Sequence, residues 1–493
     1  MSHRPEGPAP AAGDRGPLLA CVGAFAVILL FKGLVPPDTD TPWHLAQGRM
    51  LLRRWADGDL GLHAGDMFSW TARDVAWQSN GWAFDALLAA FYDVGSWIGV
   101  VALRAALLGA LVALSWVVTR HGGAGRWARA GAVWVTVAFT IPSSAMRPQL
   151  VTFVMLLLAL ELTGRSLDPE PRPPPLVVLM VLAVTVSVWA VLHGAVIAGV
   201  VAIVAACAGE VVDRRTWRWP ALTAFVAVVA SCLTPRGIGV WTYAIQTSGD
   251  SAREGIQEWQ PPSLGRGQDV LIMIFLLIVV AFALRSRFSA TTRFRWRLLA
   301  PGRVLTALAV QAVRNQPLAL LAMLPFTARM LSAAGEWLGR REGLPHLHPG
   351  RVLGAMTVGA LLGGAIQTGS LPVQANPLRS PEFPSVAAAA LPGGCRLLNE
   401  YNDGGYLILV RPDVPVSQDG RNDLYGPRRL QEQEDLLNER EPERAAASLR
   451  SLGVTCILLR ADRPLARTLA ESPGREWRRI ARDGPVEAWA RTP

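Results

Sequence analysis

The sequence predicts an α-helical polytopic membrane protein with about eleven transmembrane helices and a small C-terminal α/β domain outside the membrane. Of its 493 residues, 51% are apolar and only 17% are charged, whereas soluble domains usually carry about 25% charged residues. Apolar runs of about 17 or more residues recur over the first three quarters of the chain, as in proteins that cross a bilayer several times. The last quarter instead alternates short apolar runs with charged helical stretches, which favours a small α/β fold.

The apolar runs divide the chain into three parts. Residues 1–16 are rich in Pro, Gly and Ala, so we expect a disordered N-terminus. Residues 17–371 form the predicted membrane domain, with a long first loop at 36–95, and residues 372–493 form the C-terminal domain. The predicted spans are roughly 17–35, 96–118, 128–144, 148–164, 174–191, 194–210, 219–235, 269–285, 299–316, 317–334 and 351–371.

The distribution of arginine predicts the orientation in the membrane. The net charge of +10 comes almost entirely from arginine, since Lys32 is the only lysine. Most basic clusters fall in alternate short loops, and such loops usually face the cytoplasm. We expect a cytoplasmic N-terminus, with the 36–95 loop and residues 372–493 outside; the arginine-rich, lysine-poor composition is compatible with the plasma membrane of a high-GC bacterium. Membrane orientation explains the positive charge, so a nucleic-acid partner is not expected.

Asp38 and Asp40 follow the first predicted span directly. In an extended segment, side chains two positions apart point to the same side. Two neighbouring carboxylates can hold a cation, orient an acceptor hydroxyl, or act as a general base beside a supporting charge. A solvated turn is the alternative, because Pro and Asp both favour turns.

Several polar residues interrupt the apolar runs on the predicted outer face. Polar groups at membrane depth are costly and usually face a protein interior or a wet cavity. We therefore expect one shared outer cavity, although each residue could instead cap a helix end. The candidates are Arg147, His193, Arg236, Trp259, Arg314 and Asn315.

The first loop contains two predicted amphipathic helices. One begins near Leu45, and the other covers 82–93, with Phe84 and Leu88 on its apolar face and Asp85 and Asp93 on the other. Helices of this kind can lie in the membrane interface.

The C-terminal domain has two polar clusters. Glu400 and Tyr401 belong to one, and Asp419 and Arg421 to the other. Both clusters could contact a sugar or an acceptor, or could close turns. Cys395 and Cys456 could form a disulfide in an oxidising compartment or remain free thiols.

These motifs together resemble bacterial membrane proteins with the GT-C glycosyltransferase fold. The resemblance begins with Asp-Thr-Asp-Thr-Pro-Trp-His-Leu-Ala-Gln-Gly at 38–48 and continues with Asp-Met-Phe-Ser-Trp-Thr at 66–71. It includes Met-Arg-Pro-Gln at 146–149, Leu-His-Gly at 192–194 and Arg-Asn at 314–315. Two C-terminal motifs, at 399–406 and 419–426, complete it. In related sequences an acidic residue tends to precede the tryptophan at 82, where this chain has Gly81.

The resemblance implies an enzyme that moves a sugar from a polyprenyl-phosphate donor to an envelope acceptor at the outer face of the membrane, with inversion. Asp38 or Asp40 would be the general base or would bind a divalent cation such as Mg²⁺ or Mn²⁺. Arg147, Arg236 and Arg314 would hold the leaving phosphate, and His193 could donate to it. The acceptor could be a glycan, a lipid or a protein. The residues expected to bind substrate are His44, Asp66, Arg147, His193, Arg236, Trp259, Arg314, Asn315, Glu400, Tyr401, Asp419 and Arg421.

The alternative function is a non-catalytic transporter or flippase, or a scaffold, for lipid-linked sugars. A transporter should carry polar residues near the middle of several spans. In this sequence the unusual polar residues gather on one face, which favours a one-sided active site.

Overall fold

The structure is a computed structural model. It describes residues 15–33, 38–62, 64–168, 175–249, 257–287, 295–340, 348–369, 377–379, 383–471 and 476–492. Nearly all of the N-terminus predicted to be disordered lies outside these residues, as do Pro36 and Pro37.

Each predicted span coincides with a helix or with a broken helix. Within the described residues, five helices are long and apolar enough to cross a membrane, and a sixth crossing results if the pair bent by 65° at Met323 counts as one. The chain is therefore a multi-pass membrane protein, whereas the predicted number of eleven crossings stays a prediction. The bundle contains α1 (Gly16–Ile28), which continues into η1 (Leu29–Gly33), α4 (Arg126–Thr140), α5 (Pro148–Ser166), α6 (Pro175–Leu192), α7 (Val196–Arg214), α8 (Arg218–Ser231), α9 (Gly239–Gly249), α10 (Gly267–Arg287), α11 (Trp296–Gln311), α12 (Gln316–Ala322), α13 (Leu324–Gly339) and α14 (Pro349–Gly369).

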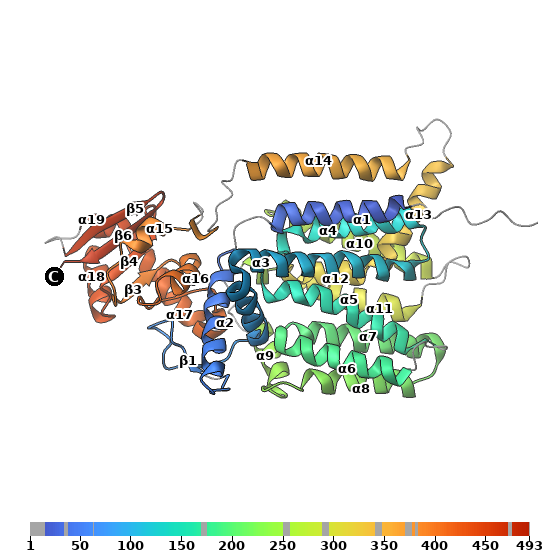
Figure 1. The fold of residues 1–493 in the computed structure, drawn as a ribbon, viewed down its shortest axis with the longest axis horizontal. Helices are drawn as coiled ribbons and strands as arrows, with labels where there is room; N and C mark the ends of the chain where they lie inside the picture. The colour runs from blue at the N-terminus through green and yellow to red at the C-terminus, as the bar shows by residue number, and fades with distance from the viewer. Residues whose placement is uncertain are drawn as a thin grey trace, which may run out of the picture.

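Close packing, more than hydrophobic exclusion, holds such a bundle together, because lipid tails are as apolar as leucine. Small residues let the helices approach one another. A Cβ on Gly209 of α7 would lie 2.5 Å from the backbone of Trp296, and a Cβ on Gly302 of α11 would lie 2.1 Å from the sulfur of Met323. The long helices consequently run side by side (Figure 1).

Two helices lie across one end of this bundle (Figure 1). They are α2 (Thr41–Ala56) and the first part of α3 (Trp82–Val118), which bends at Ser96, where φ is +50°. A Cβ on Gly48 would lie 1.9 Å from the carbonyl oxygen of Asp85, so the two helices touch through their backbones. Asp85 is therefore buried under α2, although it lies on the polar face of the predicted amphipathic helix. Only Asp93 is open to solvent on that side, where it pairs with Arg49.

The C-terminal region lies beyond the same end of the bundle (Figure 1). We call this end the domain end and the other the opposite end. The region contains a four-stranded sheet in the order β3-β4-β6-β5, in which only β3 and β4 are parallel. Cys395 and Cys456 form a disulfide beside β3 and β4. Its elements are α15 (Ser385–Ala389), β3 (Leu397–Asn399), α16 (Tyr401–Val410), α17 (Asn422–Leu437), α18 (Pro442–Ser451), β4 (Cys456–Arg460), α19 (Pro464–Glu471), β5 (Trp477–Asp483) and β6 (Val486–Arg491).

The first loop is built into this C-terminal region. Beyond the short ribbon of β1 (Ala64–Gly65) and β2 (Ala76–Trp77), Ser69 forms a parallel bridge with Val416. The indole of Trp70 donates to the carbonyl of Leu397 over 2.7 Å. Segments about 350 positions apart in sequence thus form one structural unit above the bundle.

Candidate active site at the domain end of the bundle

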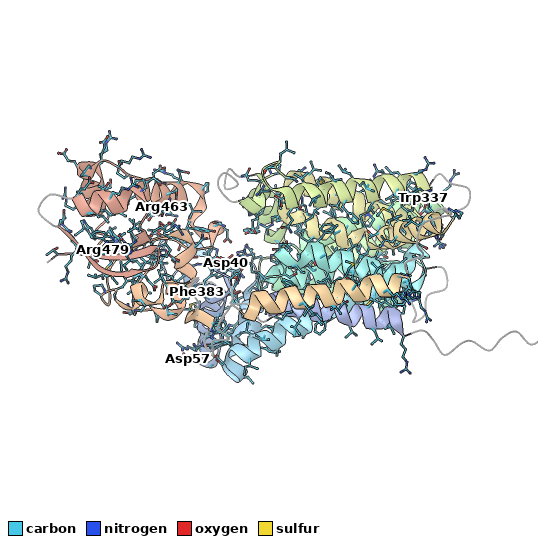
Figure 2. The ribbon with its side chains drawn as sticks, turned by 90° about the horizontal axis from the view of Figure 1, so that it is seen from above. Asp40, Asp57, Trp337, Phe383, Arg463 and Arg479 are labelled. Atoms are coloured by element: carbon cyan, nitrogen blue, oxygen red, sulfur yellow. A yellow bond between two sulfur atoms is a disulfide. The ribbon has the colours of Figure 1, made fainter. Side chains whose placement is uncertain are left out.

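A cavity of about 150 Å³ lies where the helix bundle, the first loop and the C-terminal region meet. Asp40 marks this junction in Figure 2, whereas Trp337 lies at the opposite end of the bundle. Five predicted site residues from four separate segments line the cavity, so the structure brings them together. The lining residues are Asp40, Trp43, His44, Trp77, Ser79, Asn80, Gly81, Arg147, Pro148, Gln149, His193, Glu258, Arg314 and Asp423.

Arg147 connects the two carboxylates of the first loop. It precedes α5 in an extended conformation. Its Nε donates to Oδ2 of Asp38, and its Nη1 lies 3.0 Å from Oδ2 of Asp40. Thr41 donates to Oδ1 of Asp38 through both its backbone N–H, at 3.0 Å, and its hydroxyl, at 2.5 Å. Asp38 is therefore held by two residues and Asp40 by one.

The two carboxylates have opposite pKa shifts. Burial alone would raise the pKa of Asp38, but Arg147 and the hydrogen bonds from Thr41 outweigh it and lower that pKa. Burial raises the pKa of Asp40 above its usual range, and the negative charge of Asp38 adds to the rise against the opposing charge of Arg147. Asp40, which lines the cavity, is thus the more basic of the two carboxylates.

Arg314 brings a second guanidinium into the cavity. It belongs to η6 (Val313–Asn315), between α11 and α12. Its guanidinium carbon lies 3.9 Å above the ring of Trp259, which belongs to η5 (Gln257–Trp259). Its Nη1 is 3.7 Å from Oε1 of Glu258. Trp259 is absent from the cavity wall and serves as a platform that holds Arg314.

His193 forms part of a hydrogen-bond chain. The indole N–H of Trp189 can only donate, and it donates to the hydroxyl of Thr152 over 2.9 Å. That hydroxyl lies 2.7 Å from Nδ1 of His193. Burial, helped by the positive charge of Arg314, lowers the pKa of His193 to about 3, so the imidazole is neutral.

His44, the other imidazole in the cavity wall, is held by a carboxylate. Its Nδ1 lies 2.6 Å from Oδ1 of Asp85, a carboxylate that is fully buried. Ser79 donates to the other oxygen of Asp85 over 2.7 Å. Because a carboxylate only accepts, His44 carries its proton on Nδ1. The same cavity therefore has two imidazoles fixed by different partners.

Three residues predicted to bind substrate form a closed ionic group instead. Arg421 donates to Asp66 over 2.6 Å and to Asp419 over 2.8 and 2.6 Å, and Tyr425 donates to Asp419 over 2.5 Å. The side chains of Asp66, Asp419 and Arg421 are at most 1% exposed. They lie outside the cavity wall, and both carboxylates accept hydrogen bonds from Arg421. We therefore assign them to the junction between the first loop and the C-terminal region.

Glu400 and Tyr401 also lie outside the cavity wall. Glu400 accepts two hydrogen bonds from Arg463, at 2.9 and 2.7 Å, which stabilise the C-terminal region internally. The hydroxyl of Tyr401 donates to Asn422 over 2.8 Å.

The two remaining candidates contact backbone carbonyls. Asn315 donates to the carbonyl of Leu308 over 3.1 Å, which satisfies the end of α11. Arg236 donates to the carbonyl of Gln78 and lies in a smaller adjoining cleft with Tyr243.

Three acidic partners of the site were not among the predicted site residues. Glu258 approaches Nη1 of Arg147 at 3.9 Å as well as Arg314. Asp423 accepts from Trp77 and Asn80, both at 3.0 Å, at the cavity edge. Asp85 holds His44. The position of Glu258 beside Trp259, in a segment that interrupts apolar runs, is the one signal that could have indicated it.

Among the residues that the structure describes, no group of three or more His, Cys, Asp or Glu side chains could hold a metal ion. Asp38 and Asp40, the predicted ligands, both face the guanidinium of Arg147. The donor set in this arrangement suits a cationic side chain better than a divalent ion.

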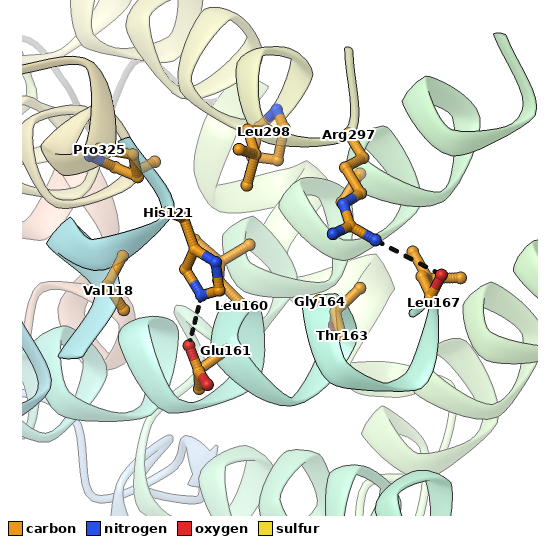
Figure 3. Close-up of a pocket in the computed structure, with 13 residues that line it drawn as sticks. Val118, His121, Leu160, Glu161, Thr163, Gly164, Leu167, Arg297, Leu298 and Pro325 are labelled. Atoms are coloured by element: carbon orange, nitrogen blue, oxygen red, sulfur yellow. Dashed lines mark hydrogen bonds and ion pairs between the residues drawn. The ribbon is translucent and has the colours of Figure 1, made fainter. Parts of the chain in front are cut away.

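A second cavity, of about 40 Å³, has a mainly apolar wall and shares no lining residue with the first (Figure 3). Glu161 accepts from His121 over 2.8 Å and pairs with Arg165 at 2.7 Å. Arg297 pairs with Asp168 at 2.9 Å. The charged groups beside this cavity are paired with one another. We therefore assign these residues to the packing between helices.

No protein-family model and no curated protein sequence matches the chain. Its structure is similar to solved structures of an oligosaccharyltransferase from Archaeoglobus fulgidus. The apo form has a TM-score of 0.62 and 9% identity, over 92% of this chain and 70% of the other. The complex of archaeal AglB with an inhibitory peptide and a dolichol-phosphate has a TM-score of 0.61 and 10% identity, over 90% and 69%. A complex with Zn and sulfate has a TM-score of 0.60 and 11% identity, over 90% and 68%. At these identities the likeness shows the fold alone, and that fold is the GT-C glycosyltransferase fold.

Proposed function

We propose that this protein is a membrane glycosyltransferase that uses a polyprenyl-phosphate sugar as its donor. One observation carries the proposal: a carboxylate, Asp40, and two guanidinium groups, Arg147 and Arg314, line a single cavity at the end of a GT-C bundle. A carboxylate can accept the proton of an acceptor hydroxyl. Guanidinium groups bind phosphate well because their donors match its oxygens.

The proposed reaction is an inverting transfer to a hydroxyl acceptor. The hydroxyl oxygen attacks the anomeric carbon while the bond from that carbon to the phosphate oxygen breaks. The hydroxyl proton passes to Asp40, and the polyprenyl phosphate leaves with the bonding electrons. Arg314 stabilises the charge that develops on the phosphate.

The two loop carboxylates take different roles in this proposal. Asp40 lines the cavity and has a raised pKa, so it is the base. Asp38 lies outside the cavity wall, has a lowered pKa and binds both Thr41 and Arg147. Its role is to position Arg147.

One observation supports a lipid phosphate donor, and a second supports a location at the outer face of the plasma membrane. One similar structure is a complex with a dolichol-phosphate, a lipid phosphate of this class. The C-terminal region contains a disulfide, and disulfides persist mainly in oxidising compartments.

The test uses the purified full-length protein in lipid nanodiscs, with polyprenyl monophosphate as the binding probe and a panel of polyprenyl-phosphate sugars as donors. Wild type should release polyprenyl phosphate from one of them, and Asp40→Asn should bind the probe normally without turnover. Turnover retained in both Asp38→Asn and Asp40→Asn would reject the site. Movement of an intact lipid-linked sugar across a vesicle bilayer would favour a transporter.

A further inference from the structure

Arg147 occupies the centre of a group of three acidic side chains from two separate segments. Its guanidinium donates to Asp38, lies 3.0 Å from Asp40 and comes within 3.9 Å of Glu258. These three side chains are 21%, 19% and 40% exposed, so the group borders the cavity and is not sealed inside the protein. Carboxylate oxygens are the ligands that a divalent cation prefers, and here three carboxylates surround a guanidinium instead.

The backbone keeps Arg147 in this position. The residue before it, Met146, is fully buried, and its carbonyl accepts from the hydroxyl of Thr41 over 3.1 Å. The residue after it, Pro148, begins α5 and restricts the backbone of Arg147 to an extended conformation. Thr41 therefore contacts both Asp38 and the segment that carries the guanidinium.

We propose that Arg147 takes the place of a divalent cation, and that this protein binds its substrates without a metal at Asp38 and Asp40. The inference deepens the proposed function and rests on it for the role of the site in transfer. A metal ion bound by these carboxylates would lie beside the guanidinium, and the repulsion of two cations at such a distance disfavours it. An arginine stays positively charged at every pH at which the protein folds, so it can neutralise these carboxylates as a bound cation would.

The decisive measurement is the binding of Mn²⁺ to the purified protein, followed by electron paramagnetic resonance. Wild type should bind no Mn²⁺ at this site at millimolar concentrations. Arg147→Met removes the guanidinium and leaves Asp38, Asp40 and Glu258 with no shared cation, so a Mn²⁺ site at least tenfold tighter than any in wild type should appear. Adding Asp40→Asn to that variant should remove it.

Two control variants keep the result interpretable. Arg236→Met deletes an arginine from a cleft next to the same cavity, but one that donates to the carbonyl of Gln78, so it should create no Mn²⁺ site. Arg147→Lys keeps a cation and should create none either. Wild-type protein that binds Mn²⁺ and loses it on Asp40→Asn would overturn the inference without recourse to any Arg147 variant.

Activity separates this inference from the proposed function. With a donor that is turned over, EDTA should leave the transfer rate of wild type unchanged. A rate abolished by EDTA and restored by Mn²⁺ would contradict the inference and leave the glycosyltransferase proposal intact. If no donor is turned over, the Mn²⁺ measurement still decides whether Arg147 replaces the metal.

Discussion

Two groups in this molecule have the same composition, one arginine between two aspartates, yet they differ in burial. Arg421 lies between Asp66 and Asp419, and all three side chains are at most 1% exposed. Arg147 lies between Asp38 and Asp40, and these side chains are 19–29% exposed. We call them the closed triad and the open triad. The buried side chains of the closed triad have no room for another partner. In the open triad, the guanidinium of Arg147 can replace a contact with an aspartate by a contact with a ligand.

The largest expected effect is on the closed triad. Arg421→Met would leave two buried carboxylates without their cation, and breaking a buried pair in this way typically costs about 3–5 kcal/mol. We expect most of the protein to misfold, as measured by thermal unfolding on detergent size-exclusion chromatography. Arg147→Met, the matched change in the open triad, should be much milder because water reaches its partners.

A triple variant tests the cause of that loss. Replacing the closed triad with Asp66→Asn, Arg421→Met and Asp419→Asn removes every charge at once, so most of the stability should return. A triple variant as unstable as Arg421→Met would show that shape, and not uncompensated charge, governs this junction.

The second effect is catalytic and belongs to the open triad. Asp40→Asn should lower kcat by about 10²–10⁴-fold, the usual contribution of a general base, with the melting temperature little changed. Asp38→Asn should cost less, because Asp38 acts through Arg147. Equal losses in the two variants would contradict the division of roles and make the pair one functional unit.

The third effect is on the pH profile. A raised pKa means that Asp40 becomes protonated while the pH is still above the usual range for aspartate, and a protonated carboxyl cannot act as a base. We expect kcat/KM to fall as the pH falls through the pKa of Asp40. Because the charge of Asp38 helps to raise that pKa, Asp38→Asn should move this acid limb to lower pH. An acid limb that stays in place would assign the titration to another group.

The smallest effect concerns the platform of Arg314. A cation–π contact is worth about 0.5–1 kcal/mol at exposed sites, so Trp259→Leu should weaken binding of polyprenyl monophosphate only about two- to fivefold. Arg314→Ala should weaken it more, because it removes the charge itself. Titration of the two variants by calorimetry gives the comparison, and equal losses would mean that Arg314 depends wholly on its platform.

The sequence predicted the open triad better than the closed one, for a physical reason. Asp38, Asp40, Arg147, His193 and Arg314 interrupt apolar runs, and a polar residue in such a run must find a polar site. Asp66, Asp419 and Arg421 lie in segments that are polar overall, where a residue that binds ligand and one that binds its neighbours look alike. The burial of Asp85 could not be predicted, because a helical period shows two faces but not that a second helix covers the polar one.

Two glycines of the C-terminal region, Gly405 and Gly420, pack directly against the first loop. A Cβ on Gly405 would lie 2.4 Å from the carbonyl oxygen of Thr39, and a Cβ on Gly420 would lie 2.1 Å from Oδ1 of Asp40. The Asp38–Asp40 segment leaves the ribosome early, yet the surface that completes its surroundings is synthesised more than 350 residues later. Every bundle helix described here except α1 is translated in the interval. The bundle can therefore be inserted into the membrane before the Asp38–Asp40 segment has its full set of contacts. A chain truncated after α14 would reach the membrane without the C-terminal residues that pack against this segment.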